Sequence, residues 1–375
     1  MGEQKKRNVS MDVIRCIALF LVISLHFFLH NGYSVQKFTG GVMLLVAITR
    51  GVSVCGVPLF LMLSGYLMSE KKLCRKYYGG IVKTYCIYVL ANVAYLVYEW
   101  IIKGTPFELK RLVFGVLDFS ILEYCWYVEM YIGLFMLIPF LNIIYHNLEG
   151  KKQKQWLLIT FMCMAAVPYV LNIHNFVVEG WWLQPTKSTE YQQIFPASWI
   201  SLGAVNYYFW GCYLKEYPLK ISKKVNCILL GVSAVVFGGY DYFRNYGYYH
   251  NPGQWQDNDS LLAVIMSVLL FNLLANIHFQ KLPRAARILL KRISGLCYGA
   301  YLVSVIFDEM FYKAVAEIYG ETGLFPRLKL YCVLVPLIYI CSLVTSLGLN
   351  TIYGFACWAI TYVRTNILKR LSEKY

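Results

Sequence analysis

The fold is decided by the stretch MDVIRCIALFLVISLHFFLH, which occupies residues 11–30. Fifteen of its twenty residues are apolar, and its length suits a helix that crosses the roughly 30 Å hydrocarbon core of a bilayer. Similar apolar runs recur along the chain as far as Val363. The sequence therefore predicts an all-α polytopic membrane protein, for which the lipid bilayer is the main solvent.

Apolar windows predict about ten transmembrane helices. They are expected near residues 12–30, 42–68, 78–102, 124–145, 155–172, 197–214, 225–243, 259–278, 294–313 and 329–350. Because no soluble insert separates them, residues 1–350 are expected to form a single transmembrane domain. The remaining residues 351–375 are aromatic at first and basic later, which favours an amphipathic cytoplasmic tail lying along the membrane surface.

The composition and the distribution of charge agree with this fold. The chain is 58% hydrophobic and only 15% charged, with a net charge of +15. Of its lysines and arginines, 23 fall in one set of alternate connections and only 9 in the other. Positive charge is retained on the cytoplasmic side, so both termini are expected to be cytoplasmic. The charge builds no basic face with interleaved aromatics, which excludes nucleic-acid binding.

The twelve cysteines indicate neither a disulfide framework nor a metal site. Most lie inside apolar runs, where cysteine behaves as a small buried hydrophobe. The sequence has no CxxC pair and no Cys/His cluster with the spacing of metal ligands, so no metal is expected.

Arg15 and His26 place a cation and an imidazole within the first apolar run. Ionisable groups inside a membrane span are costly and by default point to function. The eleven residues between them cover roughly 16 Å along a helix axis and nearly three turns, so both side chains project from almost the same face. Taken alone, Arg15 could be a snorkelling arginine and His26 a helix–helix hydrogen bond. Their shared face favours function, with Arg15 nearer the cytoplasm.

Further motifs follow this pair. Residues 57–67 read VPLFLMLSGYL, and softer motifs are WY at 126–127, IPFLN at 138–142, FWGCYLK at 209–215 and GAYL at 299–302. Together with Arg15-x10-His26, these motifs resemble acyltransferase family 3, a family of integral membrane O-acyltransferases. The resemblance covers most of the chain.

The resemblance implies an acyltransferase of the cell (plasma or inner) membrane. Such an enzyme takes an acyl group, usually acetyl, from acyl-CoA on the cytoplasmic side. It places that group on a hydroxyl of a cell-envelope or exported glycan, or of a lipid-linked sugar precursor. Arg15 and His26 would be its catalytic pair, and donor binding would fall to cations that suit the phosphates of CoA, namely Arg15, Arg75, Lys76 and Lys83.

Acyl transfer to an alcohol needs a base near the hydroxyl, and an imidazole that titrates near neutral pH is the usual solution. His26 is the candidate for this role. It would accept the proton of the acceptor directly or, as the alternative, carry the acyl group itself. His30, one turn further along, could share proton handling with His26, but an interfacial histidine is the more ordinary interpretation. Asp308 is interpreted as an acid in a structural pair.

Contacts with the acceptor are expected from Arg50, Trp126, Tyr127 and Glu129. The structural alternative for Arg50 is an ion pair with a carboxylate such as Glu129. Two outer loops, at residues 172–196 and 244–259, combine aromatic with acidic side chains, which suits sugar rings and their hydroxyls. An interfacial aromatic belt explains single residues of these loops equally well.

Two other interpretations were weighed. Ser64-Gly65 lacks the G-x-S-x-G surroundings of a nucleophilic serine, so close helix packing is the expected role of this pair.

The alternative function is a transporter or exporter of a polysaccharide or its modified precursor, with the polar face of the first helix lining a passage. Transporters often contain inverted repeats, and the two halves of this chain show no convincing repeat.

Overall fold

The computed structural model describes residues 8–177, 192–251, 253–277, 279–320 and 323–372. In these ranges the chain forms helices and no strand. The long helices are α1 (Val9–His30), α2 (Gly40–Ser53), α3 (Gly56–Met68), α5 (Val82–Lys103), α7 (Trp126–Asn147), α8 (Gly150–Ala165), α10 (Gly203–Glu216), α11 (Lys223–Asn245), α12 (Leu261–Ala275), α13 (Arg284–Tyr319) and α15 (Tyr331–Ser372). The short ones are α4 (Arg75–Tyr78), η1 (Gly79–Ile81), α6 (Leu109–Leu117), η2 (Glu123–Cys125), α9 (Pro168–Leu171), η4 (Ala197–Leu202), η5 (Gln254–Gln256), η6 (Phe279–Lys281) and α14 (Leu324–Leu328).

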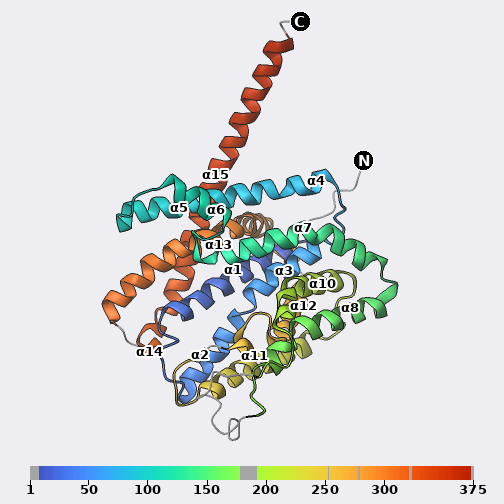
Figure 1. Ribbon diagram of the computed structural model, residues 1–375, viewed down its shortest axis with the longest axis vertical. Helices are drawn as coiled ribbons and strands as arrows, with labels where there is room; N and C mark the ends of the chain where they lie inside the picture. Colours follow the sequence, from blue (N-terminus) through green and yellow to red (C-terminus); the bar gives the residue numbers. More distant parts are fainter. Residues whose placement is uncertain (1–7, 178–191, 252, 278, 321–322, 373–375) are drawn as a thin grey trace.

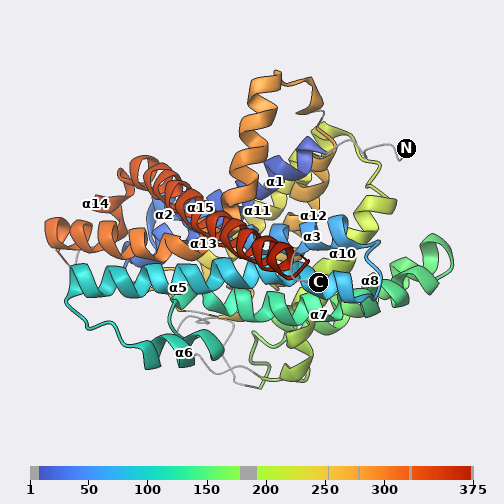
Figure 2. The same cartoon turned by 90° about the horizontal axis from the view of Figure 1, so that it is seen from above.

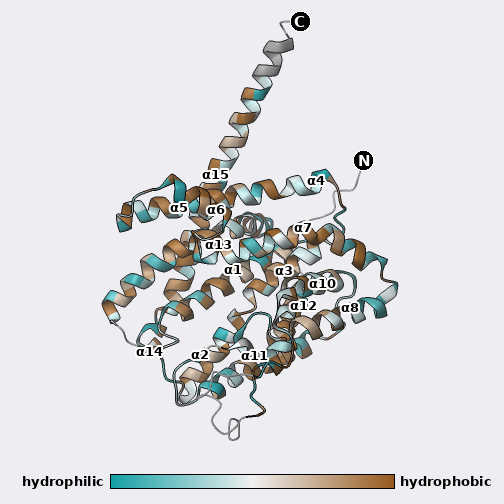
Figure 3. Ribbon diagram, viewed as in Figure 1, coloured by the Kyte–Doolittle hydropathy of each residue, from teal (hydrophilic) through white to brown (hydrophobic). Residues whose placement is uncertain are grey.

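The structure confirms the predicted fold class, an all-α membrane protein. Within the described ranges, eight helical segments are long and apolar enough to cross a membrane. Figure 3 shows hydrophobic residues along most of these helices. Two of the ten expected spans, at 197–214 and 259–278, correspond to α10 and α12, which have only 14 and 15 residues. That is short of the roughly 20 residues that a full crossing needs, so length and composition support eight spans.

The second expected helix, at 42–68, is divided into α2 and α3 around Val54 and Cys55. Pro58 lies in the first turn of α3 and has no backbone N–H to donate to the carbonyl of Val54. Proline is tolerated in the first turn and interrupts a helix interior, so the chain stops one helix and starts another here. The two halves together still form one candidate span of 29 residues.

Helix α15 continues without a break from Tyr331 to Ser372, past the boundary expected at residue 350. Figure 1 shows its last turns leaving the body of the molecule, with the C-terminus at the far tip. Phe355, Trp358 and Tyr362 are exposed on this projecting part. The assignment of residues 351–375 to a cytoplasmic tail stays a prediction.

Helix α1 occupies the middle of the bundle. It packs against α2, α3, α12, α13 and α15, as Figures 1 and 2 allow the reader to follow. Ile14, Ala18, Leu19 and Ile23 on this helix are fully buried. The helix that carries the two ionisable residues of the first span is therefore surrounded by protein.

The packing of α3 on α10 confirms the expected role of Ser64-Gly65. A Cβ at Gly65 would overlap the backbone carbonyl of Tyr208, and a Cβ at Gly211 would overlap that of Met62. The hydroxyl of Ser64 donates to the carbonyl of Phe60 in its own helix. Small residues let the two backbones touch, as is common between helices in membranes.

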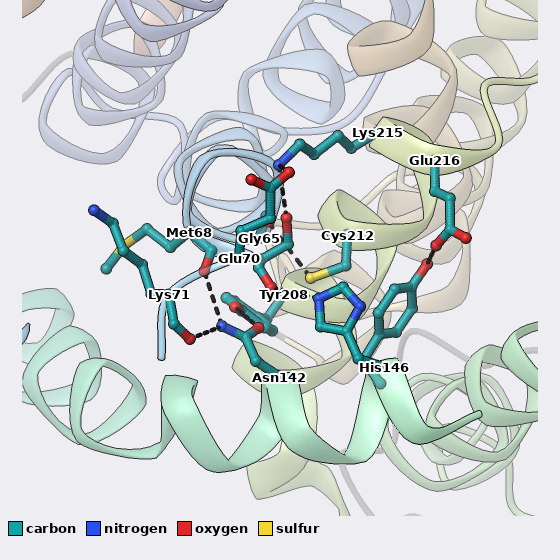
Figure 4. A network of polar contacts seen from close by, with 12 residues as sticks. Gly65, Met68, Glu70, Lys71, Asn142, His146, Tyr208, Cys212, Lys215 and Glu216 are labelled. Carbon is teal, nitrogen blue, oxygen red and sulfur yellow. Dashed lines mark hydrogen bonds and ion pairs between the residues drawn. The ribbon is translucent and has the colours of Figure 1, made fainter. Parts of the chain in front are cut away.

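The end of α3 is held by polar contacts with α7 and α10, shown in Figure 4. The Asn142 amide donates to the carbonyls of Met68 and Lys71 at 2.9 and 2.8 Å, and accepts a bond of 2.6 Å from the Tyr208 hydroxyl. Lys215 Nζ lies 2.8 Å from Glu70 Oε1. The Asn142 amide thus adds a side-chain donor at the carboxyl end of α3, where helix carbonyls lack intrahelical partners, and ties this end to α7.

Replacing Gly65 by alanine is expected to lower the free energy of unfolding by about 1–3 kcal/mol, because the added methyl group meets backbone and not a movable side chain. The measurement is the thermal unfolding midpoint in detergent. Gly231→Ala in α11, where a Cβ meets open space, is the matched control and should be neutral or stabilising. Equal midpoints for the two variants would contradict the close contact.

Candidate active site

His26 lies on α1 and faces α13. Its side chain is buried, and its Nδ1 lies 3.1 Å from Oδ2 of Asp308. A carboxylate accepts hydrogen bonds only, so we assign the tautomer in which Nδ1–H donates to the Asp308 carboxylate. In this tautomer the lone pair resides on Nε2. This tautomer leaves Nε2 available to accept a proton from a bound hydroxyl.

Tyr124 of η2 joins this pair from a third element. Its hydroxyl donates to the same Asp308 oxygen at 2.7 Å, and its ring stacks on the His26 ring with 3.9 Å between centroids. His30, one turn further along α1, has its Nε2 at 3.1 Å from the Tyr124 hydroxyl. His26, Asp308, Tyr124 and His30 thus form a continuous chain of hydrogen bonds.

A cavity of about 260 Å³, here called the His30 cavity, lies at one end of this chain. Its polar lining includes His30, Glu123, Tyr124, Asp308, Glu309 and Lys313. The predicted topology puts it on the outer side of the membrane. Polar groups of both signs in a concave site suit a ligand rich in hydroxyl groups.

A second cavity, of about 290 Å³, contains Arg15 and is here called the Arg15 cavity. It lies between α1, α3, α5, α7, α13 and α15, and its lining includes Arg15, Phe60, Lys83, Tyr127, Tyr301 and Asn350. Arg15 Nη1 donates to Ser294 Oγ at 2.7 Å, while 27% of its side chain stays exposed. Two cations beside an apolar lining suit a ligand with an anionic part and an apolar part.

The two cavities meet at a pair of tyrosines. Tyr301 lines the Arg15 cavity, and its hydroxyl donates to the backbone carbonyl of Tyr124 at 2.7 Å. Tyr124 lines the His30 cavity and stacks on His26. His26 lines neither cavity itself, and its imidazole lies against Tyr124, beside this partition.

Comparison with models of protein families identifies the family of this chain. The acyltransferase-domain model of family 3 matches residues 8–353, which is nearly the whole chain. The chain belongs to acyltransferase family 3. It is a membrane acyltransferase, as its motifs indicated. Neither the curated proteins nor the solved structures contain a match to it.

The acyltransferase brings together only some of the residues expected to bind the donor. Arg15 and Lys83 line the same cavity, where Lys83 Nζ lies 5.9 Å from the centre of the Tyr353 ring. Arg75 and Lys76 begin the short helix α4, are exposed and do not line this cavity. The helical run from Arg75 to Lys103 is continuous, so Arg75 lies about 12 Å before Lys83 along its axis and beyond the cavity.

The residues expected to contact the acceptor are also dispersed. Tyr127 is buried in the Arg15 cavity, with its ring 5.4 Å from that of Tyr301. Trp126 and Glu129 lie on the exposed side of α7. One residue along a helix turns the side chain by about 100°, so neighbours in sequence face different surroundings.

Arg50 of α2 is buried at 7% exposure, with its guanidinium 4.9 Å from the centre of the Tyr33 ring. The Tyr33 hydroxyl donates to Asp241 Oδ2 at 2.6 Å. An ion pair with Glu129, the structural alternative, is not what the structure contains. Arg50 instead belongs to a buried polar cluster around α11, because α2 packs along that helix.

Sequence reasoning missed Tyr124. It favoured structural pairing for Asp308 and an interfacial position for His30, with proton handling beside His26 as the alternative for His30. The available signal was Asp308 itself, an acid inside an apolar run, which is costly unless it has a partner. Among the described residues, no group of three or more histidines, cysteines or acids could hold a metal ion.

Proposed function

We propose that this membrane acyltransferase moves an acyl group, expected to be acetyl, from cytoplasmic acyl-CoA to a hydroxyl of a cell-envelope or exported glycan or its lipid-linked precursor. The observation that carries the proposal is the His26–Asp308 pair beside the partition between two cavities. An oriented imidazole next to separate cavities for an anionic donor and a hydroxyl-rich acceptor is what acyl transfer to an alcohol requires. The enzyme would act in the plasma or inner membrane.

The donor would occupy the Arg15 cavity. Arg15 and Lys83 supply fixed positive charge for the phosphates of CoA, and Phe60, Leu63 and Ile87 supply apolar surface for the pantetheine arm and acyl chain. Arginine binds phosphate through a planar fork of donors, which a lysine cannot reproduce. The thioester end would then point toward Tyr301 and the imidazole.

The acceptor would enter from the His30 cavity. Nε2 of His26 takes the proton of the acceptor hydroxyl while the hydroxyl oxygen attacks the thioester carbonyl. The new C–O bond forms, the C–S bond breaks, and the departing CoA thiolate takes the proton from His26. Asp308 holds the imidazole in the tautomer that this step needs and stabilises the imidazolium formed along the way. Passage of the thioester past Tyr301 requires that side chain to move.

Replacing Arg15 by alanine is expected to raise the KM for acyl-CoA by about 10- to 100-fold, since a hydrogen bond to a charged group contributes about 1.5–3 kcal/mol. The measurement is the rate of CoA release against donor concentration. Arg292→Ala, on the exposed beginning of α13, removes an arginine outside the cavity and serves as control. Equal donor KM values for the two variants would remove Arg15 from the donor site.

The proposal is tested with purified protein in lipid nanodiscs, supplied with acetyl-CoA and with deacylated envelope glycan from the producing cells. We expect free CoA thiol to appear in step with acylated glycan. A transporter would move glycan without consuming the thioester. Absence of CoA release from folded protein with acetyl-CoA and with longer acyl-CoA donors would overturn the proposal.

A further inference from the structure

A third cavity, of about 340 Å³, is used by none of the steps above and is here called the Trp126 cavity. It lies between the start of α7, the short helix α9, the η4–α10 junction and the loop before α12. Its lining includes Trp126, Tyr169, Ser201, Gly203, Asp257 and Asp259. Two aromatic rings, a hydroxyl and two carboxyl groups therefore face one space.

The loop that carries the two carboxyl groups is anchored on α11. Trp255 Nε1 and Gln256 Nε2 donate to Asp241 Oδ1 at 3.3 and 2.7 Å, directly before Asp257. On the other side, Ser260 caps α12 by accepting from the backbone N–H of Ala263. The Tyr207 hydroxyl donates to the carbonyl of Asn258, between the two acids. These contacts hold the carboxyl groups in place before any ligand arrives.

One carboxyl oxygen of Asp259 has no protein partner in the described part of the chain. This atom, Oδ1, is buried. A Cβ at Gly203 would overlap this carboxyl group, so only glycine leaves room for it there. Burial, with the nearby Asp257 as the second cause, raises the pKa of Asp259 to about 7. A buried carboxyl oxygen without a partner is costly, which points to a ligand group that completes it.

The aromatic side chains complement these acids. Trp126 is 48% exposed although it lines the cavity, and Tyr169 lies in the same wall. A sugar ring has an apolar face of C–H groups and a rim of hydroxyls. An indole ring suits the face and carboxyl groups suit the rim, whereas a purely apolar ligand would leave the buried oxygen of Asp259 unsatisfied.

The Trp126 cavity adjoins the candidate active site through one short segment. Tyr124 lines the His30 cavity, Trp126 the third cavity and Tyr127 the Arg15 cavity. All three residues belong to the η2–α7 junction. A glycan chain bound at Trp126 would therefore contact the same segment that positions His26.

We propose that the Trp126 cavity binds a pyranose unit of the glycan acceptor other than the unit that is acylated. The inference rests on the proposed function, whose acceptor it defines as a chain longer than one sugar. Trp126 would stack on the ring of this unit, and Asp257 and Asp259 would bind its hydroxyls. The acceptor class is then an oligosaccharide or polysaccharide and not a free monosaccharide.

The test uses deacylated envelope polysaccharide of the producing cells, hydrolysed and separated into monosaccharide and oligosaccharide fractions. Binding of each fraction to the full-length protein in nanodiscs is measured by calorimetry without acyl-CoA. We expect wild type to bind oligosaccharides more tightly than monosaccharides. Asp259→Asn and Trp126→Ala should each weaken oligosaccharide binding by about tenfold or more and leave monosaccharide binding unchanged. Trp156→Ala, at an exposed position of α8 outside the cavity, is the matched control.

Two outcomes would overturn the inference. The first is that the wild-type protein binds no oligosaccharide. The second is that both variants keep the wild-type unfolding midpoint and bind oligosaccharide as tightly as wild type. Should Trp126→Ala fail to fold, the near-isosteric Asp259→Asn variant decides the question alone. CoA release, measured separately on the same preparations, reports on the proposed function. A protein that releases CoA but binds oligosaccharide independently of these residues refutes only the Trp126 cavity.

Discussion

Replacing His26 by alanine is expected to lower the rate of CoA release in the presence of glycan by about 10²- to 10⁴-fold, the usual contribution of a positioned general base. The variant removes the imidazole whose Nδ1 lies 3.1 Å from Asp308. Because His26 does not line the Arg15 cavity, the KM for acyl-CoA should change little. The measurement is steady-state thiol release by purified protein in nanodiscs.

The matched control is His146→Ala. His146 lies on α7 and hydrogen-bonds to the carbonyl of Ser69, outside all three cavities described above. It should retain nearly the full rate. A His26→Ala enzyme that works as fast as the His146→Ala enzyme would show that the imidazole is not the base.

Replacing Asp308 by asparagine is expected to lower kcat by about 10²-fold or more while leaving the KM for acyl-CoA unchanged. An amide keeps the size of the side chain but can donate to Nδ1, which would move the proton to Nε2 and block its role as base. Asp308 acts through His26, so it is a positioning residue. The split between kcat and KM distinguishes this role from a general loss of folded protein.

Tyr124→Phe separates the two bonds that Asp308 accepts. It removes the 2.7 Å bond from the tyrosine hydroxyl but keeps the ring that stacks on His26. We expect a smaller fall in kcat than for Asp308→Asn, because the imidazole tautomer is preserved.

The matched control for Asp308→Asn is Asp118→Asn, which removes a carboxylate at an exposed turn. An Asp308→Asn enzyme equal to this control would refute the role of the carboxylate.

Local apolar patterning was enough to predict the helical membrane fold. A run of apolar residues long enough to span a bilayer has few other structures open to it, since backbone groups in lipid must bond within their own segment. The break between α2 and α3, the short lengths of α10 and α12 and the continuation of α15 past residue 350 escaped prediction. The break depends on one proline, and the short helices depend on packing against other helices. The continuation of α15 runs through residues 351–363, which are still mostly apolar.

The candidate site was predictable only where one helix carries it. Arg15 and His26 share α1, and helix geometry relates them directly. Asp308 lies 282 residues from His26, and Tyr124 lies on a different element again. Their meeting depends on how α13 and η2 pack on α1, which no local pattern contains. Trp126 and Tyr127 are adjacent in sequence but line different cavities, which sequence proximity could not predict either.

The most direct test of acyl transfer through His26 is mass spectrometry of surface glycan from cells that lack the native gene and produce either wild type or His26→Ala. Membrane levels of the two proteins are matched beforehand. The structure and the proposed mechanism predict glycan bearing acyl groups with wild type and bare glycan with His26→Ala. Equal acylation of the glycan in the two strains would contradict the catalytic role of His26.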